Sequence, residues 1–252
     1  IMEYFNQNIL NPILEDTTNP RIGLIALSTD FTIEQDFRKI CHSLPVDIFV
    51  NRIPFNNPLN HENYLKMANH IPEVCDQILP GQNIDVVAYG CTSGTIAIGE
   101  KEIINQIRKS KPNTLVTTPI TAALKAFKKL KFQKIAVLTP YPKDVNLTVF
   151  NYLKNFNIEI ESFSSFNLNY DSEIAQVSLK SLKDQISKIN FNNIDGLFVS
   201  CTALKIVDIL EDLENDFKIN VISSNQALIW DSLKLSNIKE NQINGFGNLF
   251  KI

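Results

Sequence analysis

Residues 83–92 read NIDVVAYGCT, and residues 193–202 read NIDGLFVSCT. Each stretch begins with Asn-Ile-Asp, continues as a short apolar run typical of a buried strand, and ends on Cys-Thr. The two cysteines, Cys91 and Cys201, are 110 positions apart. Because Asn-Ile-Asp and Cys-Thr lie outside the generic apolar run, their recurrence favours an internal repeat over chance similarity between strands.

Flanking segments repeat with nearly the same spacing. Residues 25–28 (IALS) match residues 136–139 (AVLT), and residues 116–118 (VTT) match residues 221–223 (VIS). Small changes in spacing are what loop insertions produce. The sequence therefore predicts two similar halves of four strands each.

Apolar runs alternate along the whole chain with amphipathic segments of helical length. The predicted strands are 22–27, 46–50, 84–89, 114–117, 135–138, 158–163, 196–199 and 220–222. The predicted helices are 32–42, 62–78, 99–109, 121–130, 143–156, 172–189, 203–213 and 225–235. Most strands are apolar throughout, as strands covered on both faces are. This alternation predicts an α/β fold with two pseudo-symmetric lobes, each a four-stranded parallel sheet flanked by helices.

Composition excludes several classes of protein. The 252 residues carry a net charge of −3 and are 44% hydrophobic, so the chain can bury a core and offers no basic surface for nucleic acid. No run of 18 apolar residues predicts a membrane helix, and the polar first 20 residues resemble neither a signal nor a transit peptide. The four cysteines form no CxxC pair, which argues against a disulfide scaffold or structural zinc. We therefore expect a cytoplasmic protein with no membrane or nucleic-acid partner.

Cys91 and Cys201 are the candidate reactive residues. Each is predicted to lie just past the carboxyl end of a strand and at the start of a helix, where open α/β sheets bind ligands and where a thiol pKa falls. Two opposed thiols suit proton removal from, or attack on, one carbon with proton delivery from the other face. The alternative is simple burial of small side chains, which we predict for Cys41 and Cys75.

Absent motifs narrow the chemistry further. The three histidines all lie in the first third of the chain and none sits at a predicted strand end, so a Cys-His hydrolase is not supported. No glycine-rich phosphate loop is present. The sequence therefore predicts no metal and no nucleotide or pyridoxal phosphate cofactor.

Residues 87–95, 138–141, 200–204 and 224–227 resemble the maleate isomerase and arylmalonate decarboxylase family of the Asp/Glu racemase superfamily. Asn51-Arg52, Pro54, Pro58 and the closing residues 245–247 are most similar to the ectoine-utilisation A proteins. The resemblance extends from about residue 21 to residue 250. It implies a homodimer, no cofactor, and an active site between two lobes. The expected lobes are residues 20–120 with 224–252, and residues 121–223.

The resemblance also implies roles for individual residues. Cys91 takes the place of the maleate isomerase nucleophile and Cys201 that of its partner acid or base; the decarboxylases keep only the second-lobe cysteine, which argues against decarboxylation here. Tyr141 matches a carboxylate-binding tyrosine, although it could be a turn residue between two prolines. Substrate-binding residues are also expected, some of which have alternative roles as helix caps or loop residues: Thr92, Ser93, Thr118, Asn169, Thr202 and Ala203.

Asp30 departs from the family pattern. It stands after the first strand, where maleate isomerases carry an Asn that contacts the substrate carboxylate. An ionised Asp repels a carboxylate and attracts an ammonium group, which favours an amino-acid-like substrate over a plain dicarboxylate. Asp30 could instead cap the following helix, or be neutral through a raised pKa.

Two hypotheses of function follow. The first is a cofactor-independent isomerase or racemase of a small carboxylate or amino-acid-like substrate, with a possible place in ectoine or hydroxyectoine breakdown. In it, Cys91 either adds to an alkene or exchanges an α-proton with Cys201. The second is a non-catalytic ligand binder or sensor of the same fold. Decarboxylation of a malonate-like acid is a further alternative.

Overall fold

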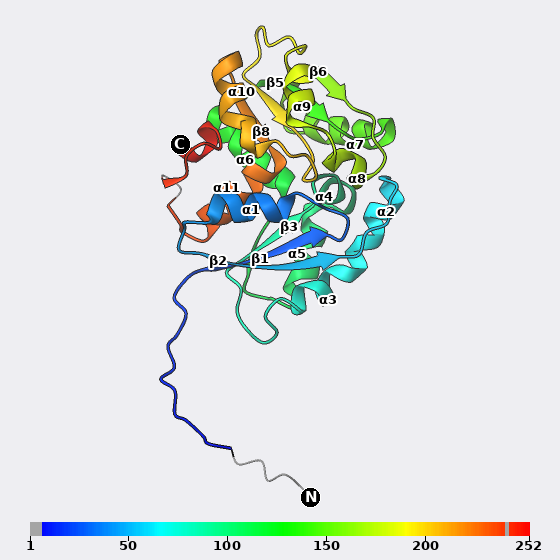
Figure 1. Cartoon of the computed structure of the whole chain (residues 1–252). Helices are drawn as coiled ribbons and strands as arrows, with labels where there is room; N and C mark the ends of the chain where they lie inside the picture. The colour runs from blue at the N-terminus through cyan, green and yellow to red at the C-terminus, as the bar shows by residue number, and fades with distance from the viewer. Residues whose placement is uncertain (1–6, 240–241) are drawn as a thin grey trace, which may run out of the picture.

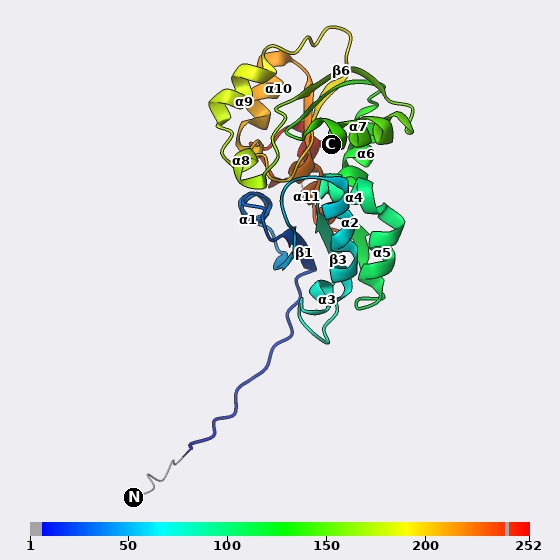
Figure 2. The same ribbon diagram turned by 90° about the vertical axis from the view of Figure 1, so that its right-hand side faces the viewer.

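The computed structural model describes residues 7–239 and 242–252 and consists of two α/β lobes (Figures 1 and 2). The first lobe contains a parallel sheet in the order β2-β1-β3-β4. Its strands are β1 (Arg21–Leu27), β2 (Asp47–Ile53), β3 (Val86–Gly90) and β4 (Leu115–Thr117). Residues 7–20 precede this sheet as an exposed segment without regular secondary structure.

The second lobe repeats the first in sequence order and topology. Its parallel sheet has the order β6-β5-β7-β8, which is the order of the first sheet shifted by four strands. The strands are β5 (Lys134–Thr139), β6 (Glu159–Ser165), β7 (Gly196–Val199) and β8 (Asn220–Ser223). The predicted fold class of two four-stranded parallel lobes is confirmed.

The two repeat strands occupy the same place in their sheets. Every residue of β3 and of β7 is buried, which explains why both stretches are apolar throughout. The preceding aspartates bond the neighbouring strand in the same way. Asp85 accepts from the backbone N–H of Arg21, and Asp195 accepts from the backbone N–H of Lys134. The recurring Asn-Ile-Asp therefore marks the entry to each central strand.

Helices cover both sheets. They are α1 (Ile33–Cys41), α2 (His61–Lys66), α3 (Ile71–Asp76), α4 (Thr92–Ile98), α5 (Glu100–Arg108), α6 (Pro119–Leu130), α7 (Lys143–Lys154), α8 (Asp171–Ala175), α9 (Leu179–Ile186), α10 (Leu210–Phe217) and α11 (Ser224–Leu235). Short 3-10 turns are η1 (Met67–His70), η2 (Val207–Ile209) and η4 (Asn248–Lys251).

Three predicted helices differ from the structure. The segment 62–78 is divided into α2, η1 and α3, and Pro72 lies in the first turn of α3. The segment 172–189 is divided into α8 and α9, because Ser178 starts a new helix by accepting from the backbone N–H of Ser181.

The third prediction, a helix over 203–213, is wrong in its first half. Residues 202–206 form a turn, and α10 begins only at Leu210. Cys201 has a φ of 124°, and contacts with Ser224 and Ala203 hold its backbone and sulfur in this conformation. Ala203, Leu204 and Ile206 are all buried, so their apolar character reflects a buried turn whose sequence pattern resembles a helix face.

The helices that end the two halves are exchanged between the lobes. Helix α6 follows β4 of the first sheet but packs against β8, and its Phe127 contacts Phe198 of β7 edge-on. Helix α11 follows β8 of the second sheet but packs against β3, β4 and α1. The two exchanged helices also pack against each other. Each lobe therefore includes a helix that belongs, in chain order, to the other half.

The predicted lobe boundaries of 20–120 with 224–252, and 121–223, remain a prediction. Within the described residues, no helix has the length and apolar character needed to cross a bilayer. The same part of the chain contains no group of three or more His, Cys, Asp or Glu placed to hold a metal ion.

Candidate active site

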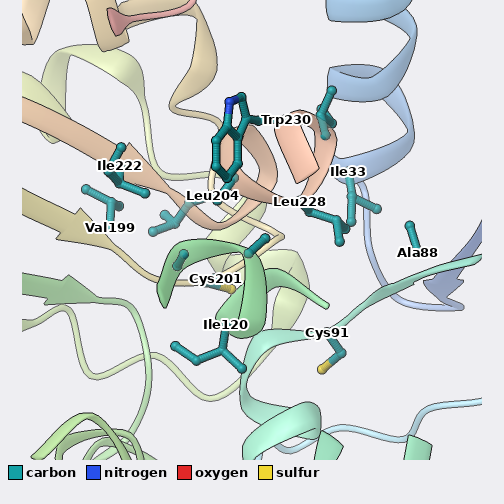
Figure 3. Close-up of a cluster of buried hydrophobic side chains, with 14 of the residues drawn as sticks. Ile33, Ala88, Cys91, Ile120, Val199, Cys201, Leu204, Ile222, Leu228 and Trp230 are labelled. Carbon is teal, nitrogen blue, oxygen red and sulfur yellow. The ribbon is translucent and has the colours of Figure 1, made fainter. Parts of the chain in front are cut away.

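Cys91 and Cys201 lie where the two central strands end. Cys91 directly follows β3, and Cys201 follows β7 after one residue. Their side chains belong to one buried cluster with Ile120 and Leu228 (Figure 3). Each residue is almost inaccessible, at 3% exposed for Cys91 and 6% for Cys201. The fold thus brings one thiol from each half into the region between the lobes.

Cys91 is the N-cap of α4. Its sulfur accepts a hydrogen bond from the backbone N–H of Gly94 at 3.2 Å, and the Ser93 hydroxyl lies 4.0 Å away. A Cβ on Gly94 would lie only 2.7 Å from the Cys91 sulfur and 2.7 Å from the Met67 methyl group. Glycine is therefore needed for the backbone to approach the thiol.

The predicted fall in the Cys91 pKa is not observed. Burial raises the pKa of the Cys91 thiol to about 12, and the hydrogen bond from Gly94 opposes that rise only in part. The negative charges of Asp171 and Asp30 raise it further. Desolvation therefore outweighs the helix N-terminus, and Cys91 is a neutral thiol when the site holds no ligand.

Cys201 lies in a turn, so the helix start predicted for it is wrong. Its positive φ is a conformation that non-glycine residues rarely adopt and that is found mainly where tertiary contacts impose it. The Cys201 sulfur accepts from the backbone N–H of Ala203 at 3.4 Å. Burial raises the pKa of Cys201 well above its usual value, and the charges of Asp171 and Asp30 add to the rise.

Ser224 connects the two Cys-Thr segments. Its hydroxyl oxygen accepts from the Thr92 hydroxyl at 2.8 Å and from the backbone N–H of Cys201 at 3.0 Å. Ser224 is fully buried at the start of the exchanged helix α11. The neighbouring Ser223 is the N-cap of that helix. One side chain therefore fixes both cysteine-bearing loops relative to each other, a role that the sequence did not reveal.

The remaining predicted residues of the second cysteine loop also make contacts between halves. The Thr202 hydroxyl donates to the carbonyl of Gly90 at 3.4 Å, and the carbonyl of Ala203 accepts from the Thr32 hydroxyl at 2.8 Å. Asn225 donates to the Thr202 carbonyl at 2.8 Å. These bonds hold Cys201 against the end of β3.

Tyr141 is brought into the cluster. It is 2% exposed, and its hydroxyl lies 3.3 Å from the Ser200 hydroxyl. Burial raises its pKa well above the usual value. Tyr141 is therefore a neutral hydrogen-bond donor beside the two thiols.

Asp30 caps α1. Its Oδ1 accepts from the backbone N–H groups of Thr32 and Ile33 at 2.6 and 2.9 Å. Burial raises the pKa of Asp30, and these two amides oppose the rise. Its charge still acts on both thiols, so the capping role and a place beside the site are compatible.

Two predicted residues have other surroundings. Thr118 is the N-cap of α6 and accepts from the backbone N–H of Thr121 at 3.3 Å. Asn169 is exposed, and its backbone N–H donates to Glu173 at 3.1 Å. These hydrogen bonds do not connect either residue to the groups around the thiols.

Sequence reasoning missed Tyr64 and Asp171. Tyr64 is 2% exposed, stacks on Phe55 with ring centroids 5.3 Å apart, and lies within electrostatic range of both cysteines. Asp171 is 4% exposed and raises the pKa of both thiols. Tyr64 lies in an ordinary helical pattern, and Asp171 in the loop where Asn169 was singled out. No local signal distinguished either residue.

A cavity of about 110 Å³ lies beside these groups. Tyr64 and Ser93 form part of its wall, together with Val145 and Val149 of α7. A larger hollow of about 700 Å³ is lined by residues such as Asp85 and Thr114, before β3 and β4 begin, so it lies at the opposite edge of the sheet from the cysteines.

Two parallel α/β lobes with a thiol from each at their junction agree with the resemblance to the Asp/Glu racemase superfamily. A family model described as arylmalonate decarboxylase matches residues 58–250. The chain belongs to the arylmalonate decarboxylase family.

Individual relatives include enzymes of two kinds. The maleate isomerase of Alcaligenes faecalis is 20% identical over 227 residues, covering 85% of this chain and 90% of its own. The arylmalonate decarboxylase of Bordetella bronchiseptica is 26% identical over 136 residues, covering 53% and 57%. The chain is thus similar to isomerases over most of its length and to a decarboxylase over about half.

Solved structures share the fold. A cysteine-to-serine mutant of the Nocardia farcinica maleate cis-trans isomerase, carrying a covalently bound succinylcysteine intermediate, has a TM-score of 0.85 at 18% identity and covers 92% of this chain and 98% of its own. A liganded double mutant of arylmalonate decarboxylase has a TM-score of 0.80 at 21% identity, covering 92% and 99%.

Proposed function

We propose that this protein is a cofactor-independent isomerase or racemase of a small carboxylate or amino-acid-like substrate. The observation that carries the proposal is that the buried Cys91 and Cys201, one from each half, lie on loops joined through Ser224 and within electrostatic range of the same Tyr141. Ionisable groups with strongly shifted pKa values cluster at functional sites. Two buried thiols within electrostatic range of Tyr141, Asp30 and Asp171 therefore indicate a reaction centre.

In the racemase version, one cysteine is the base and the other is the acid. The thiolate of Cys91 takes the α-proton of the substrate, and the thiol of Cys201 delivers a proton to the opposite face of the same carbon. The cysteines exchange protonation states in one turnover and the reverse reaction restores them. Backbone N–H groups in the two cysteine loops would stabilise the enediolate oxygens.

In the isomerase version, Cys91 acts as a nucleophile. Its thiolate adds to one carbon of a cis double bond, the resulting single bond rotates, and elimination of the thiolate forms the trans alkene. Support comes from the relative in Nocardia farcinica, for which a succinylcysteine intermediate is reported.

The substrate-binding residues remain proposals. Tyr141 would donate to a substrate carboxylate, as its buried and protonated hydroxyl suits. Ser93 and the backbone of Ala203 are adjacent to the thiols and would hold oxygen atoms. Thr92 and Thr202 act through the bonds that position the loops. Thr118, the N-cap of α6, and the exposed Asn169 remain candidate substrate contacts.

Two other functions are the rivals. Decarboxylation of a malonate-like acid is favoured by the family model and by the Bordetella bronchiseptica relative. A non-catalytic sensor would bind its ligand beside the same two thiols without turnover. We place both behind isomerisation because a second opposed thiol serves proton transfer to two faces. We further propose that the protein forms a homodimer, is located in the cytoplasm and catalyses a step in ectoine or hydroxyectoine breakdown.

The test is incubation in deuterium oxide with amino acids, maleate and malonate-like acids, followed by NMR. Solvent deuterium at an α-carbon indicates racemisation, geometric change without α-exchange indicates cis–trans isomerisation, and loss of carbon dioxide indicates the decarboxylase. If none of the candidate acids changes, the enzyme proposal fails and the sensor remains.

A further inference from the structure

Asp171 is a buried carboxyl group that no established role explains. It begins α8 in the second half, is 4% exposed, and reaches across to the first half. Its Oδ2 accepts from the Thr29 hydroxyl, and its backbone N–H donates to Asn57 at 3.4 Å. Among the ion pairs within the described part of the chain, none includes Asp171. A buried acid without a cation is an incomplete arrangement.

The Tyr64 hydroxyl provides an independent sign of a missing ligand. It is completely buried and has no hydrogen-bond partner of ordinary geometry among the described residues, and Ser93 is close enough to oppose the rise in the Tyr64 pKa. Its position is within electrostatic range of Cys91, Cys201 and Asp171. Buried hydroxyl groups are normally bonded, and an unbonded one beside two thiols indicates a polar ligand atom.

The negative charge around the thiols favours a ligand that carries a positive charge. Asp171 and Asp30 both raise the pKa of Cys91 and Cys201. The pKa of Asp171 itself is raised by burial only to about 6, so the carboxyl is mostly ionised at neutral pH. A dianion would add to this negative field, whereas a cationic group would compensate Asp171 and lower both thiol pKa values.

Asp171 is better suited than Asp30 to receive a cation. The Oδ1 of Asp30 accepts from two amides at the start of α1, and a Thr202 hydrogen bond and the charge of Arg52 also stabilise its carboxylate. Asp171 accepts a single hydrogen bond in the described structure, through Oδ2, which leaves its other oxygen available.

We infer that Asp171 and the Tyr64 hydroxyl form a subsite for the ammonium group of an α-amino or diamino acid bound between Cys91 and Cys201. The inference rests on the proposed function for the reaction and adds the class of substrate. It assigns recognition of the amino group to a residue of the second half, two positions after Asn169. Binding of the ammonium group also activates the site, because it favours formation of the thiolate that the proposed reaction needs.

The test is ligand binding by the full chain, followed by calorimetry and thermal unfolding. The probes are L-aspartate, D-aspartate and L-2,4-diaminobutyrate, compared with succinate and maleate, which lack the amino group. Wild type is expected to bind at least one amino acid more tightly than either dicarboxylate. Asp171→Asn is expected to weaken amino-acid binding by about 10-fold or more, since the bond to an ionised group is lost.

Two further variants separate binding from folding. Tyr64→Phe keeps the stack on Phe55 and removes only the unbonded hydroxyl, so it should weaken amino-acid binding without lowering the melting temperature. Asp184→Asn, an exposed acid on α9, is the matched control and should bind as wild type does.

The inference is overturned if none of the amino acids binds, or if Asp171→Asn binds them as wild type does. It is also overturned if the dicarboxylates bind more tightly than all three amino acids. Failure of the proposed reaction is distinguishable. Amino acids would then bind in an Asp171-dependent way but show no deuterium exchange at the α-carbon.

Discussion

At the scale of single residues, burial keeps the two thiols of the proposed site neutral. Both cysteines are positioned by backbone N–H groups, Gly94 for Cys91 and Ala203 for Cys201. Those bonds favour a thiolate, but burial has the larger effect and raises both pKa values. Reactivity therefore depends on what the substrate brings into the cluster.

Replacing either thiol by a hydroxyl should remove turnover. We expect Cys91→Ser and Cys201→Ser each to lower kcat by about 100-fold or more, the usual contribution of a positioned acid, base or nucleophile. Steady-state kinetics on the substrate found by NMR measures this. Cys41→Ala, a change at a buried thiol in α1, is the control and should keep wild-type kcat. Full activity of either serine variant would remove that cysteine from the mechanism.

Gly94 is predicted to be irreplaceable for steric reasons. In Gly94→Ala the new methyl group would lie 2.7 Å from the Cys91 sulfur, so the thiol must move. We expect a loss of about 1–3 kcal/mol in the free energy of unfolding, as in overpacked cores, and a fall in kcat. Urea denaturation and kinetics measure the two effects. Gly23→Ala in β1 meets Ile84 at a more tolerable 3.3 Å and should be milder; equal effects would contradict the steric argument.

At the scale of elements, α1 and α11 are joined by a buried polar contact. Asp36 of α1 accepts from the Asn225 side chain of α11 at 2.7 Å, and both residues are about 2% exposed. Burial raises the pKa of Asp36 to about 7, although Asn225 and Lys39 oppose the rise. The contact therefore stabilises the fold most when Asp36 is protonated.

The pH dependence of stability follows from that shift. A carboxyl group whose pKa is higher in the folded state stabilises the protein at low pH, and this stability is lost as pH rises from about 4 to about 7. Asp36→Asn keeps an acceptor for Asn225 and removes the charge. Between pH 4 and pH 8, the free energy of unfolding of wild type should therefore fall by about 4 kcal/mol more than that of Asp36→Asn.

Denaturant unfolding of both proteins at the two pH values measures the difference. Asp208→Asn is the control, because Asp208 is 41% exposed in its pair with Lys39 and such surface pairs contribute about 1 kcal/mol or less. If the free energies of unfolding of Asp36→Asn and wild type change with pH in the same way, the pKa of Asp36 is not raised in the folded protein.

At the scale of the whole molecule, the exchanged helices make the two lobes interdependent. Helices α6 and α11 each follow one sheet, pack on the other, and contact each other. Ser224 of α11 then joins the two cysteine loops. The proposed reaction centre therefore requires both lobes to be folded and docked.

We therefore predict one cooperative unfolding transition. Trp230, the single tryptophan, lies buried in α11 and reports on the junction by fluorescence, while circular dichroism reports on both lobes. The two signals should give the same urea midpoint and slope, as two-state unfolding requires. Two separate transitions would show that the lobes fold independently and that the exchange does not couple them.

Much of this arrangement could be predicted from the sequence. The strand periodicity and the repeated NID…CT stretches predicted eight strands in two parallel sheets, and all eight are confirmed to within three residues at either end. The two cysteines were singled out because their spacing equals that of the repeat. Such features are local, since apolar runs and turn residues specify strands without knowledge of distant contacts.

The sequence by itself determined the fold class, the pairing of the halves and the two thiols, because these depend on patterns along the chain. Only the tertiary structure decided that Cys201 begins a strained turn, that both thiols are neutral, and that Tyr64, Asp171 and Ser224 surround or join them. Those properties depend on burial and on contacts between residues more than 20 positions apart, such as Thr29 with Asp171. Desolvation and long-range hydrogen bonds are set by the packed molecule and leave no local signal in the chain.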